Sequence, residues 1–159
     1  MTTAQDARPP VIFIVGPTAT GKTAAAMSLA PSLPVQIINA DSRQVYRGMS
    51  IGTAKPTQAE QDAVPHHLID VADPTEGYSL ATFLSQARAA IVDVQTAGAL
   101  PVVVGGTGQY VWGLADGWLV PEVPPQAGIR QRLELEAADV GAEALHARLA
   151  AVDPDAAAT

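Results

Sequence analysis

Short apolar runs alternate with helix-like segments along the first two thirds of the chain. Four such runs, each typical of a strand, lie at residues 11–15, 35–39, 68–71 and 102–104. The first run has no polar position, which predicts a strand buried on both faces of its sheet. The last run is followed at once by a glycine-rich turn.

Segments with helical character separate these runs. Residues 24–30 are rich in alanine and predict a helix that the following proline ends. Thr57, with Glu60 three positions later, has the pattern of a capping box and predicts a short helix. Ser79 is predicted to cap a longer helix, whose apolar positions recur every three or four residues and whose end is marked by Gly98.

This alternation predicts an α/β fold with a parallel sheet flanked by helices, formed by residues 11–120. We expect residues 1–10 to be a disordered tail. From residue 121 the composition of the sequence changes. Prolines come first, and two stretches rich in alanine, leucine and charged residues follow, at 126–138 and 141–152. They predict the start of a helical insertion over residues 121–159.

A phosphate-binding loop is predicted between the first strand and the first helix. The pattern G-x-x-x-x-G-K-[ST] is matched by Gly16-Pro17-Thr18-Ala19-Thr20-Gly21-Lys22-Thr23. Such a loop turns backbone N–H groups toward phosphate oxygens, while Lys22 adds a positive charge and the Thr23 hydroxyl binds Mg²⁺. The sheet is therefore expected to be of the P-loop NTPase type, and the loop indicates a polyphosphate ligand without selecting ATP.

A carboxylate follows the second predicted strand. Asp41 is expected at the carboxyl edge of the sheet, where the phosphate loop also opens. Three roles fit it: it holds Mg²⁺ through water, it accepts a proton from a nucleophile, or it caps the next turn. Asp70 has a similar position with weaker surroundings. His66 and His67 are adjacent on a strand and point to opposite faces, so they do not chelate one metal and are read as structural.

The glycine-rich turn after residues 102–104 supplies another polar group at the same edge. Thr107 lies in that turn and is able to donate or accept a hydrogen bond. Four aromatic residues are candidates for stacking on a base or an isoprenoid, although each alone is more often part of a core: Tyr46, Tyr110, Trp112 and Trp118.

Composition excludes several classes of protein. The chain has no cysteine, which excludes disulfides, zinc–thiolate sites, iron–sulfur clusters and thiol nucleophiles. No apolar run approaches the roughly 18 residues of a membrane helix, and the polar N-terminus is unlike a secretory signal, so we expect a cytoplasmic protein without membrane contact.

The net charge of −7 argues against indiscriminate binding of nucleic acid. The segment from Lys22 to Lys55 is the exception, since Arg43 and Arg47 also lie in it and Asp41 is its single acid. That segment is predicted to face phosphates.

Several blocks together resemble the tRNA dimethylallyltransferases, also called tRNA isopentenyltransferases. They are the phosphate loop, the run Asn39-Ala40-Asp41-Ser42-Arg43-Gln44-Val45-Tyr46-Arg47-Gly48-Met49, the run Ile51-Gly52-Thr53-Ala54-Lys55-Pro56, the run His66-His67-Leu68-Ile69-Asp70, the pair Tyr78-Ser79, and the run Gly105-Gly106-Thr107-Gly108-Gln109-Tyr110. The blocks follow the order and spacing of the family over residues 11–153. The second and third blocks are more specific than the phosphate loop.

The resemblance implies transfer of a dimethylallyl group from dimethylallyl diphosphate to N6 of adenosine 37, beside the anticodon in the anticodon stem-loop of tRNA, with release of diphosphate. It implies that Asp41 is the general base and that Lys22, Thr23 and Mg²⁺ stabilise the leaving diphosphate on the phosphate loop. It also implies contacts with tRNA from Asp41, Ser42, Arg43, Gln44, Thr107 and Arg130.

Members of the family are about twice this length, so the resemblance implies a C-terminally truncated chain with weak or no activity alone. Other readings of the residues stay open. A small-molecule or nucleotide kinase would use the same loop, but it needs an arginine-rich lid, and from Asp116 onward only three arginines stand among eight acids. Prenylation of free adenine nucleotides is a second alternative, and a non-catalytic regulator that needs no general base is a third.

Overall fold

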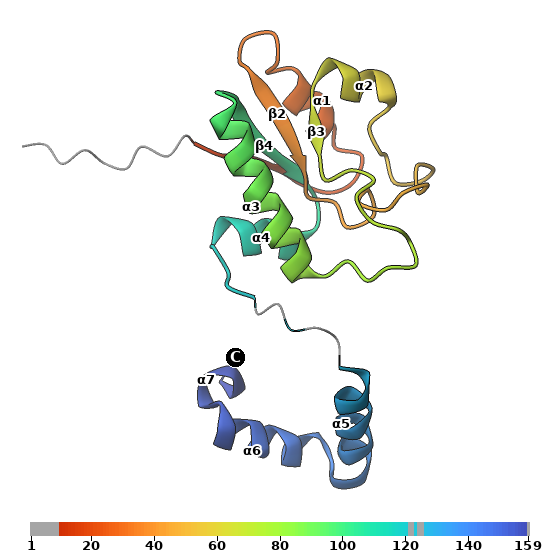
Figure 1. Cartoon of the computed structure of the whole chain (residues 1–159), viewed down its shortest axis with the longest axis vertical. Helices are drawn as coiled ribbons and strands as arrows, with labels where there is room; N and C mark the ends of the chain where they lie inside the picture. The colour runs from red at the N-terminus through yellow and green to blue at the C-terminus, as the bar shows by residue number, and fades with distance from the viewer. Residues whose placement is uncertain (1–9, 121–122, 124–125, 159) are drawn as a thin grey trace, which may run out of the picture. The chain divides into compact units, whose positions relative to one another are not determined.

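The computed structural model describes residues 10–120, 123 and 126–158. It divides the chain into two compact units, Met1–Glu122 and Val123–Thr159, which we describe separately (Figure 1). The elements of the first unit are β1 (Ile12–Val15), α1 (Lys22–Met27), β2 (Val35–Asn39), α2 (Gln58–Ala63), β3 (His66–His67), α3 (Leu80–Thr96), β4 (Leu100–Gly105) and α4 (Gly108–Ala115).

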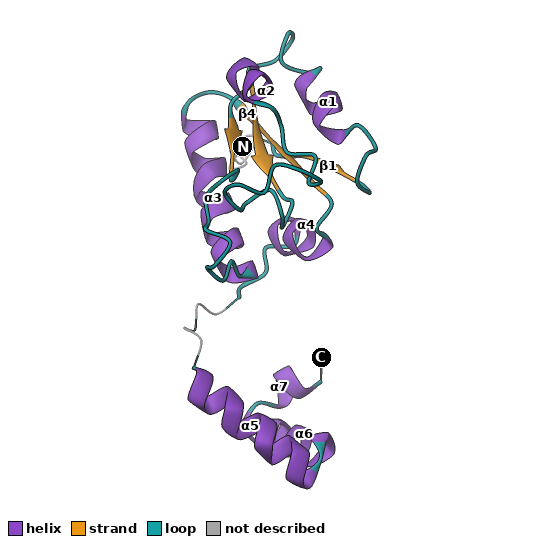
Figure 2. Ribbon diagram, turned by 90° about the vertical axis from the view of Figure 1, so that its right-hand side faces the viewer, coloured by secondary structure: helices purple, strands orange, loops and turns teal. Residues whose placement is uncertain are grey.

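The four strands form one parallel sheet in the order β1-β4-β2-β3. Ile12 and Ile37 both lie opposite Val102, so β4 is the central strand between β1 and β2. Helices connect successive strands and cover both faces of the sheet (Figures 1 and 2). The predicted α/β class and parallel sheet are confirmed.

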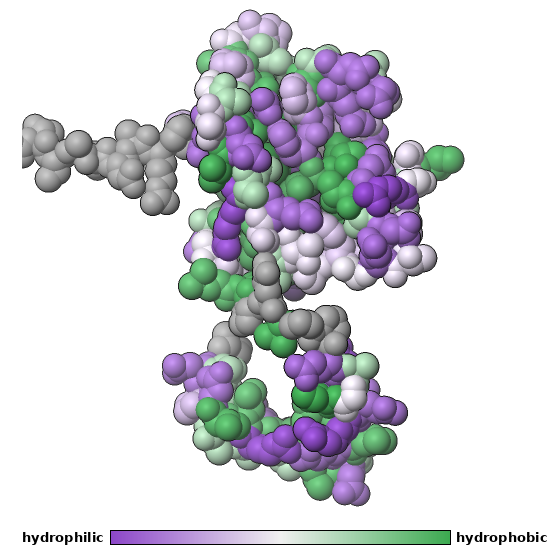
Figure 3. Space-filling model, in the orientation of Figure 1, coloured by the Kyte–Doolittle hydropathy of each residue, from purple (hydrophilic) through white to green (hydrophobic). Residues whose placement is uncertain are grey.

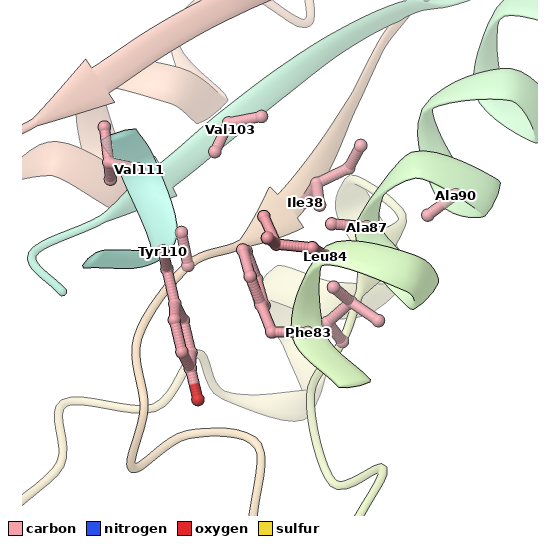
Figure 4. Packing of buried hydrophobic residues seen from close by; sticks show 10 residues of the cluster. Ile38, Phe83, Leu84, Ala87, Ala90, Val103, Tyr110 and Val111 are labelled. Carbon is pink, nitrogen blue, oxygen red and sulfur yellow. The ribbon is translucent and has the colours of Figure 1, made fainter. Parts of the chain in front are cut away.

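The alternation of side chains along β2 and β4 separates two hydrophobic clusters. Ile38 and Val103 point to the face that packs against α3 and α4, where Phe83 and Tyr110 join them (Figure 4). Their immediate neighbours along the strands, such as Ile37, point to the opposite face and pack with residues of α1. Period-two alternation in the two central strands thus forms both halves of the core.

The first strand differs from its prediction. β1 lies at an edge of the sheet, and its first three residues are half-buried rather than buried. Val15 is 54% exposed. A continuous apolar run does not reveal whether a strand is central or at an edge, because its sequence does not show how many neighbours it has.

Two further elements are displaced from their predictions. The first helix was expected over residues 24–30, but α1 begins at Lys22 and ends at Met27, before a series of turns. The third strand was expected over residues 68–71, but β3 is formed by the two residues His66–His67. Leu68 and Asp70 adopt left-handed backbone conformations, with φ of 60° and 56°, which end the strand.

The predicted caps are confirmed. Thr57 accepts a hydrogen bond from the backbone N–H of Glu60, and the Glu60 carboxylate accepts one from the N–H of Thr57, so the capping box of α2 is complete. The Ser79 hydroxyl accepts a hydrogen bond from the N–H of Thr82 at the start of α3. No helix in the described part of the chain is long and apolar enough to span a membrane.

The second unit contains α5 (Ala127–Val140), α6 (Ala142–Val152) and α7 (Pro154–Ala157). None of the described residues in these helices is buried, and hydrophobic residues appear on the surface of this unit among polar ones (Figure 3). The side chains of Arg148 and Glu136 form an ion pair between α6 and α5. The predicted disordered tail, apart from its last residue, and the predicted proline turn at 121–125, apart from Val123, lie outside the described residues.

Candidate active site

The phosphate loop connects β1 to α1 with a backbone that curls on itself. Ala19 and Gly21 adopt left-handed conformations, with φ of 65° and 78°. The Thr20 hydroxyl and the Lys22 ammonium both donate hydrogen bonds to the carbonyl oxygen of Pro17, at 2.9 and 2.6 Å. These local contacts close the loop and place its lysine over it, as a phosphate-binding loop requires.

Two consecutive glycines bring three strand ends together. A Cβ atom on Gly105 would lie 2.1 Å from the carbonyl oxygen of Ala40, which follows β2. A Cβ on Gly106 would lie 2.9 Å from the carbonyl oxygen of Gly16, which begins the phosphate loop. Only glycine permits such approaches. The end of β4 therefore packs directly against the loops that follow β1 and β2.

Thr107 links the glycine-rich turn to the segment after β2. Its hydroxyl oxygen accepts a hydrogen bond from the N–H of Ser42 at 3.0 Å, and the hydroxyl lies 3.2 Å from that of Ser42, to which it donates. The backbone N–H of Thr107 also donates to the carbonyl oxygen of Ala40. Two residues predicted to contact tRNA, 65 positions apart, are thus hydrogen-bonded neighbours.

Asp41 follows β2 and turns its carboxylate toward its own loop. Oδ1 accepts hydrogen bonds from the backbone N–H groups of Arg43 and Gln44, at 2.9 and 3.4 Å. Asp41 therefore does cap the turn that follows it, which is one of the three roles considered for this residue. For Oδ2 there is no hydrogen-bond partner within the described part of the chain, so a second oxygen is left for another group.

Two cavities meet at Asp41. The first, of about 230 Å³, is lined by most of the phosphate loop, including Lys22 and Thr23, together with Asp41. The second, of about 330 Å³, is lined by Asp41, Ser42, Arg43 and Thr107 and by the start of the phosphate loop. The structure thus places the predicted base beside both the predicted phosphate grip and the predicted nucleoside contacts.

Gln44 was expected to contact tRNA, but its side chain is buried. The residue is 9% exposed, and its amide nitrogen donates to the carbonyl oxygens of Thr53 and Ala54, at 3.0 and 3.2 Å. The Thr53 hydroxyl in turn donates to the carbonyl oxygen of Met49. The side chain of Gln44 therefore holds the 49–54 turn, while that of Arg43 remains exposed to solvent.

The basic segment was expected to face phosphates, and Lys55 does not. Its side chain is only 4% exposed, and its ammonium donates to Asp70 Oδ1 and to the carbonyl oxygen of Tyr46, each at 2.7 Å. Asp70 is thereby given a structural partner, in line with the weaker case made for it as a catalytic acid. The sequence held one signal: Lys55 is the single charged residue between Arg47 and Glu60.

Asn39, the last residue of β2, was not singled out from the sequence. It is 3% exposed, and its amide donates to the carbonyl oxygens of Leu68 and Asp41, at 2.9 and 3.3 Å. Its own side-chain oxygen accepts from the N–H of Asp41 at 3.2 Å. A polar residue that ends an apolar strand is the signal that would have identified it.

The two histidines of β3 occupy different environments. His66 Nδ1 lies 2.7 Å from the carbonyl oxygen of Val64, and His67 Nε2 lies 2.7 Å from the side-chain oxygen of Gln36. Burial lowers the pKa of both imidazoles. No cluster of three potential metal ligands of the His, Cys, Asp or Glu type occurs among the described residues.

The aromatic candidates divide between core and surface. Tyr110 stacks on Phe83 with ring centroids 4.0 Å apart (Figure 4). Tyr46 packs edge-on against Tyr78, and burial raises the pKa of Tyr78 to about 12. Tyr46 and Tyr110 are therefore packing residues. The other two aromatic candidates, Trp112 and Trp118, lie on the surface and are 60% and 40% exposed.

Arg130 lies on α5, in the second unit. It is exposed and lines a hollow together with Ile129, Leu133 and Leu145. Arg130 thus belongs to the second unit, whereas the site at the sheet edge belongs to the first. Its contact with tRNA stays a prediction.

Similarity to known proteins covers both units. A family model described as IPP transferase matches residues 44–159. The chain is 57% identical over 150 residues to the tRNA dimethylallyltransferase of Roseiflexus sp. strain RS-1, over 94% of this chain and 49% of that protein. It is also 57% identical over 148 residues to the tRNA dimethylallyltransferase of Anaeromyxobacter sp. strain Fw109-5, over 93% and 49% of the two chains.

Two solved structures share the fold. The full-length tRNA isopentenylpyrophosphate transferase of Bacillus halodurans has a TM-score of 0.68 at 45% identity, over 94% of this chain and 50% of that chain. A eukaryotic dimethylallyltransferase, captured acting on tRNA, has a TM-score of 0.74 at 31% identity, over 92% and 36%. The chain spans about half the length of the curated relatives it matches. With these identities and the family match over residues 44–159, the chain belongs to the IPP transferase family.

Proposed function

We propose that this chain provides the diphosphate grip and the general base of a tRNA dimethylallyltransferase. The supporting observation is that Asp41 lines both the cavity of the phosphate loop and the cavity of Thr107. Transfer to an amine is favoured when donor and acceptor are held next to each other and a base lies within reach of the amine proton. The sequence identity of 57% to a tRNA dimethylallyltransferase supports a prenyl donor rather than ATP.

In this proposal the exocyclic N6 of adenosine 37 attacks C1 of dimethylallyl diphosphate. The new N6–C1 bond forms as the C1–O bond breaks, and diphosphate leaves with the bonding electrons. The N6 proton passes to the Asp41 carboxylate, whose Oδ1 is already held by two backbone N–H groups. A positioned carboxylate makes a weakly nucleophilic aromatic amine more reactive by removing this proton.

The phosphate loop binds the diphosphate through its backbone N–H groups and Lys22. Lys22 exchanges its hydrogen bond with the Pro17 carbonyl for one with a diphosphate oxygen. Apolar residues in the same cavity, Ile37, Pro56, Ile69 and Val104, suit a hydrocarbon group.

Oxygen donors suited to Mg²⁺ line this cavity as well. Thr23 offers a hydroxyl and Asp41 a carboxylate, both of which are hard ligands. Thr23 would hold the ion, which when bound neutralises charge on the diphosphate.

The second cavity is assigned to the nucleoside. Ser42 and Thr107 present hydroxyl groups there, and Arg43 adds a positive charge near the RNA backbone. A base paired or stacked in RNA does not reach such a cavity, so the adenosine must be extruded. Since tRNA is the acceptor, the proposal places the protein in the cytoplasm.

The test uses a chimera in which residues 1–159 replace the matching half of the Roseiflexus enzyme, which supplies its own second half. Purified chimera is incubated with bulk tRNA and either dimethylallyl diphosphate labelled with ¹⁴C in the prenyl group or ATP labelled with ³²P in the γ-phosphate. We expect label in RNA from the prenyl donor alone. Transfer of ³²P to any acceptor, with no prenyl transfer, would establish a kinase instead. The intact Roseiflexus enzyme is the positive control.

A further inference from the structure

Residues outside the turn that carries Asp41, residues 41–46, hold that turn in place. Gln44 and Tyr46 lie in this turn, and their carbonyl oxygens are both occupied by groups from distant parts of the chain. The backbone N–H of Asp70 donates to the carbonyl oxygen of Gln44 at 3.2 Å. The ammonium of Lys55 donates to the carbonyl oxygen of Tyr46 at 2.7 Å.

These two anchors are bound to each other. Lys55 Nζ lies 2.7 Å from Asp70 Oδ1, and the Lys55 side chain is 4% exposed. The Asp70 side chain is 43% exposed, but the ammonium is buried, and a buried ammonium without a carboxylate is costly. A short parallel bridge between Tyr46 and Ala72, with hydrogen bonds on either side, aligns the two segments.

Lys55 does not contribute to either cavity. Its neighbours Ala54 and Pro56 both line the phosphate-loop cavity, whereas Lys55 lines neither that cavity nor the one beside Thr107. The ammonium thus points away from the substrates. Its position suits a role that acts through the backbone of the 41–46 turn.

Asp70 carries a conformational cost at the same place. Its φ of 56° lies in the left-handed region, which residues other than glycine, asparagine and aspartate seldom adopt. The conformation directs the Asp70 N–H to Gln44 while the side chain reaches Lys55. Strain of this kind persists only where surrounding contacts maintain it.

We propose that Lys55 and Asp70 are positioning residues for Asp41: their ion pair fixes the 41–46 turn and thereby fixes the direction of the Asp41 carboxylate. The path runs from the pair to the carbonyl oxygens of the turn, and from its N–H groups, at Arg43 and Gln44, to Asp41 Oδ1. The inference rests on the proposed function, which assigns proton transfer to Asp41.

Asp70→Asn is the decisive variant. Asparagine tolerates a left-handed backbone and nearly preserves the shape of the side chain, so the change removes the carboxylate charge without altering the backbone preference at this position. Asp73→Asn is its matched control, because Asp73 Oδ1 accepts hydrogen bonds from the N–H and the hydroxyl of Thr75, within its own turn. Lys55→Met is a second variant that removes the ammonium.

The first readout is amide hydrogen exchange in the 159-residue chain, followed by NMR. We expect exchange at Arg43 and Gln44 to rise by about tenfold or more in Asp70→Asn, while exchange at Ile38 in β2 stays unchanged. Asp73→Asn is expected to match the wild type. Unchanged exchange at Arg43 and Gln44, or an equal rise at Ile38, would overturn the proposal, because the pair would then be either irrelevant to the turn or a general stabiliser.

The second readout is prenyl transfer by the chimera. We expect kcat to fall by about tenfold in Asp70→Asn, with KM for dimethylallyl diphosphate changed by less than about twofold. A rise in KM at constant kcat would contradict a positioning role. If the wild-type chimera transfers nothing, the proposed function fails, while the exchange measurement still decides whether the pair orders the turn.

Discussion

Two loops at the same sheet edge are built in opposite ways. The phosphate loop, residues 16–23, is largely exposed, and the side-chain hydrogen bonds described within it converge on its own Pro17 carbonyl. The 41–56 segment is twice as long, yet its own buried side chains and contacts with Asp70 and Ala72 hold it in place. Backbone geometry alone is enough to grip a diphosphate, whereas one carboxylate needs a tertiary scaffold to hold its direction.

The largest expected effect, a loss of prenyl transfer, comes from a change in the 41–56 segment. Asp41→Asn keeps a side-chain oxygen for the N–H of Arg43 but removes the base, so we expect prenyl transfer by the chimera to fall by about 10²- to 10⁴-fold. Affinity for inorganic pyrophosphate, measured by titration calorimetry, should stay within about twofold. Asp116→Asn, at the exposed end of α4, is the control. Full transfer by Asp41→Asn would remove the base from the proposal.

The next largest effect is expected where the end of β4 packs against the segment after β2, at Gly105 and Ala40. Gly105→Ala places a Cβ against the Ala40 carbonyl, and the backbone must move apart to accept it. We expect the free energy of unfolding in urea to fall by about 2–3 kcal/mol. Gly108→Ala is the matched control, because no atom lies within 4 Å of its added Cβ. Equal stability of the two variants would show that the strand ends do not pack as described.

A smaller effect is expected on pyrophosphate binding when only the phosphate loop is changed. Lys22→Met removes a charged donor from an exposed loop, so we expect affinity for inorganic pyrophosphate to fall by about tenfold while thermal stability is unchanged. Arg47→Met, an exposed cation that lines neither cavity, is the control for overall charge. A similar loss in both variants would indicate attraction by net charge rather than a grip by the loop.

The smallest effect is on the pH dependence of stability. Burial lowers the pKa of His66 and His67 below the ordinary value of 6.5, so the unfolded chain binds more protons than the folded chain near that pH. Their contribution to stability is complete above pH 6.5 and is lost as the pH falls through the lowered values. Urea midpoints measured between pH 7.5 and 5 should decrease, and the double change His66→Gln, His67→Gln should flatten this slope. An unchanged slope would assign the pH dependence to other groups.

The sequence predicted those parts of the fold that depend on local signals. The strand at 35–39, the capping box at Thr57 and the cap at Ser79 all depend on neighbouring residues, and each occurs where expected. The placement of Asp41 beside the phosphate loop followed from the rule that parallel strands share a carboxyl edge.

The missed features depend on residues far apart in the chain. Gln44 and Lys55 look like polar residues of a surface loop. Only the folded chain shows that Gln44 donates to the carbonyl oxygens of Thr53 and Ala54, and Lys55 to the carbonyl oxygen of Tyr46 and the carboxylate of Asp70. The third strand was misplaced because left-handed residues at 68 and 70 interrupt an apolar run, and non-glycine residues give no warning of such a conformation. Whether β1 is central or at an edge depends likewise on partners that the run itself does not encode.

That position of β1 has a practical consequence. One side of the strand bonds to β4, and among the described residues no strand bonds to the other, which leaves a row of apolar side chains beside open backbone donors and acceptors. An edge strand of this kind is able to pair with a further strand, from this chain or from another one. Preparations of the 159-residue chain should therefore self-associate more as their concentration rises, and a proline introduced on the open side of β1 should keep them monomeric.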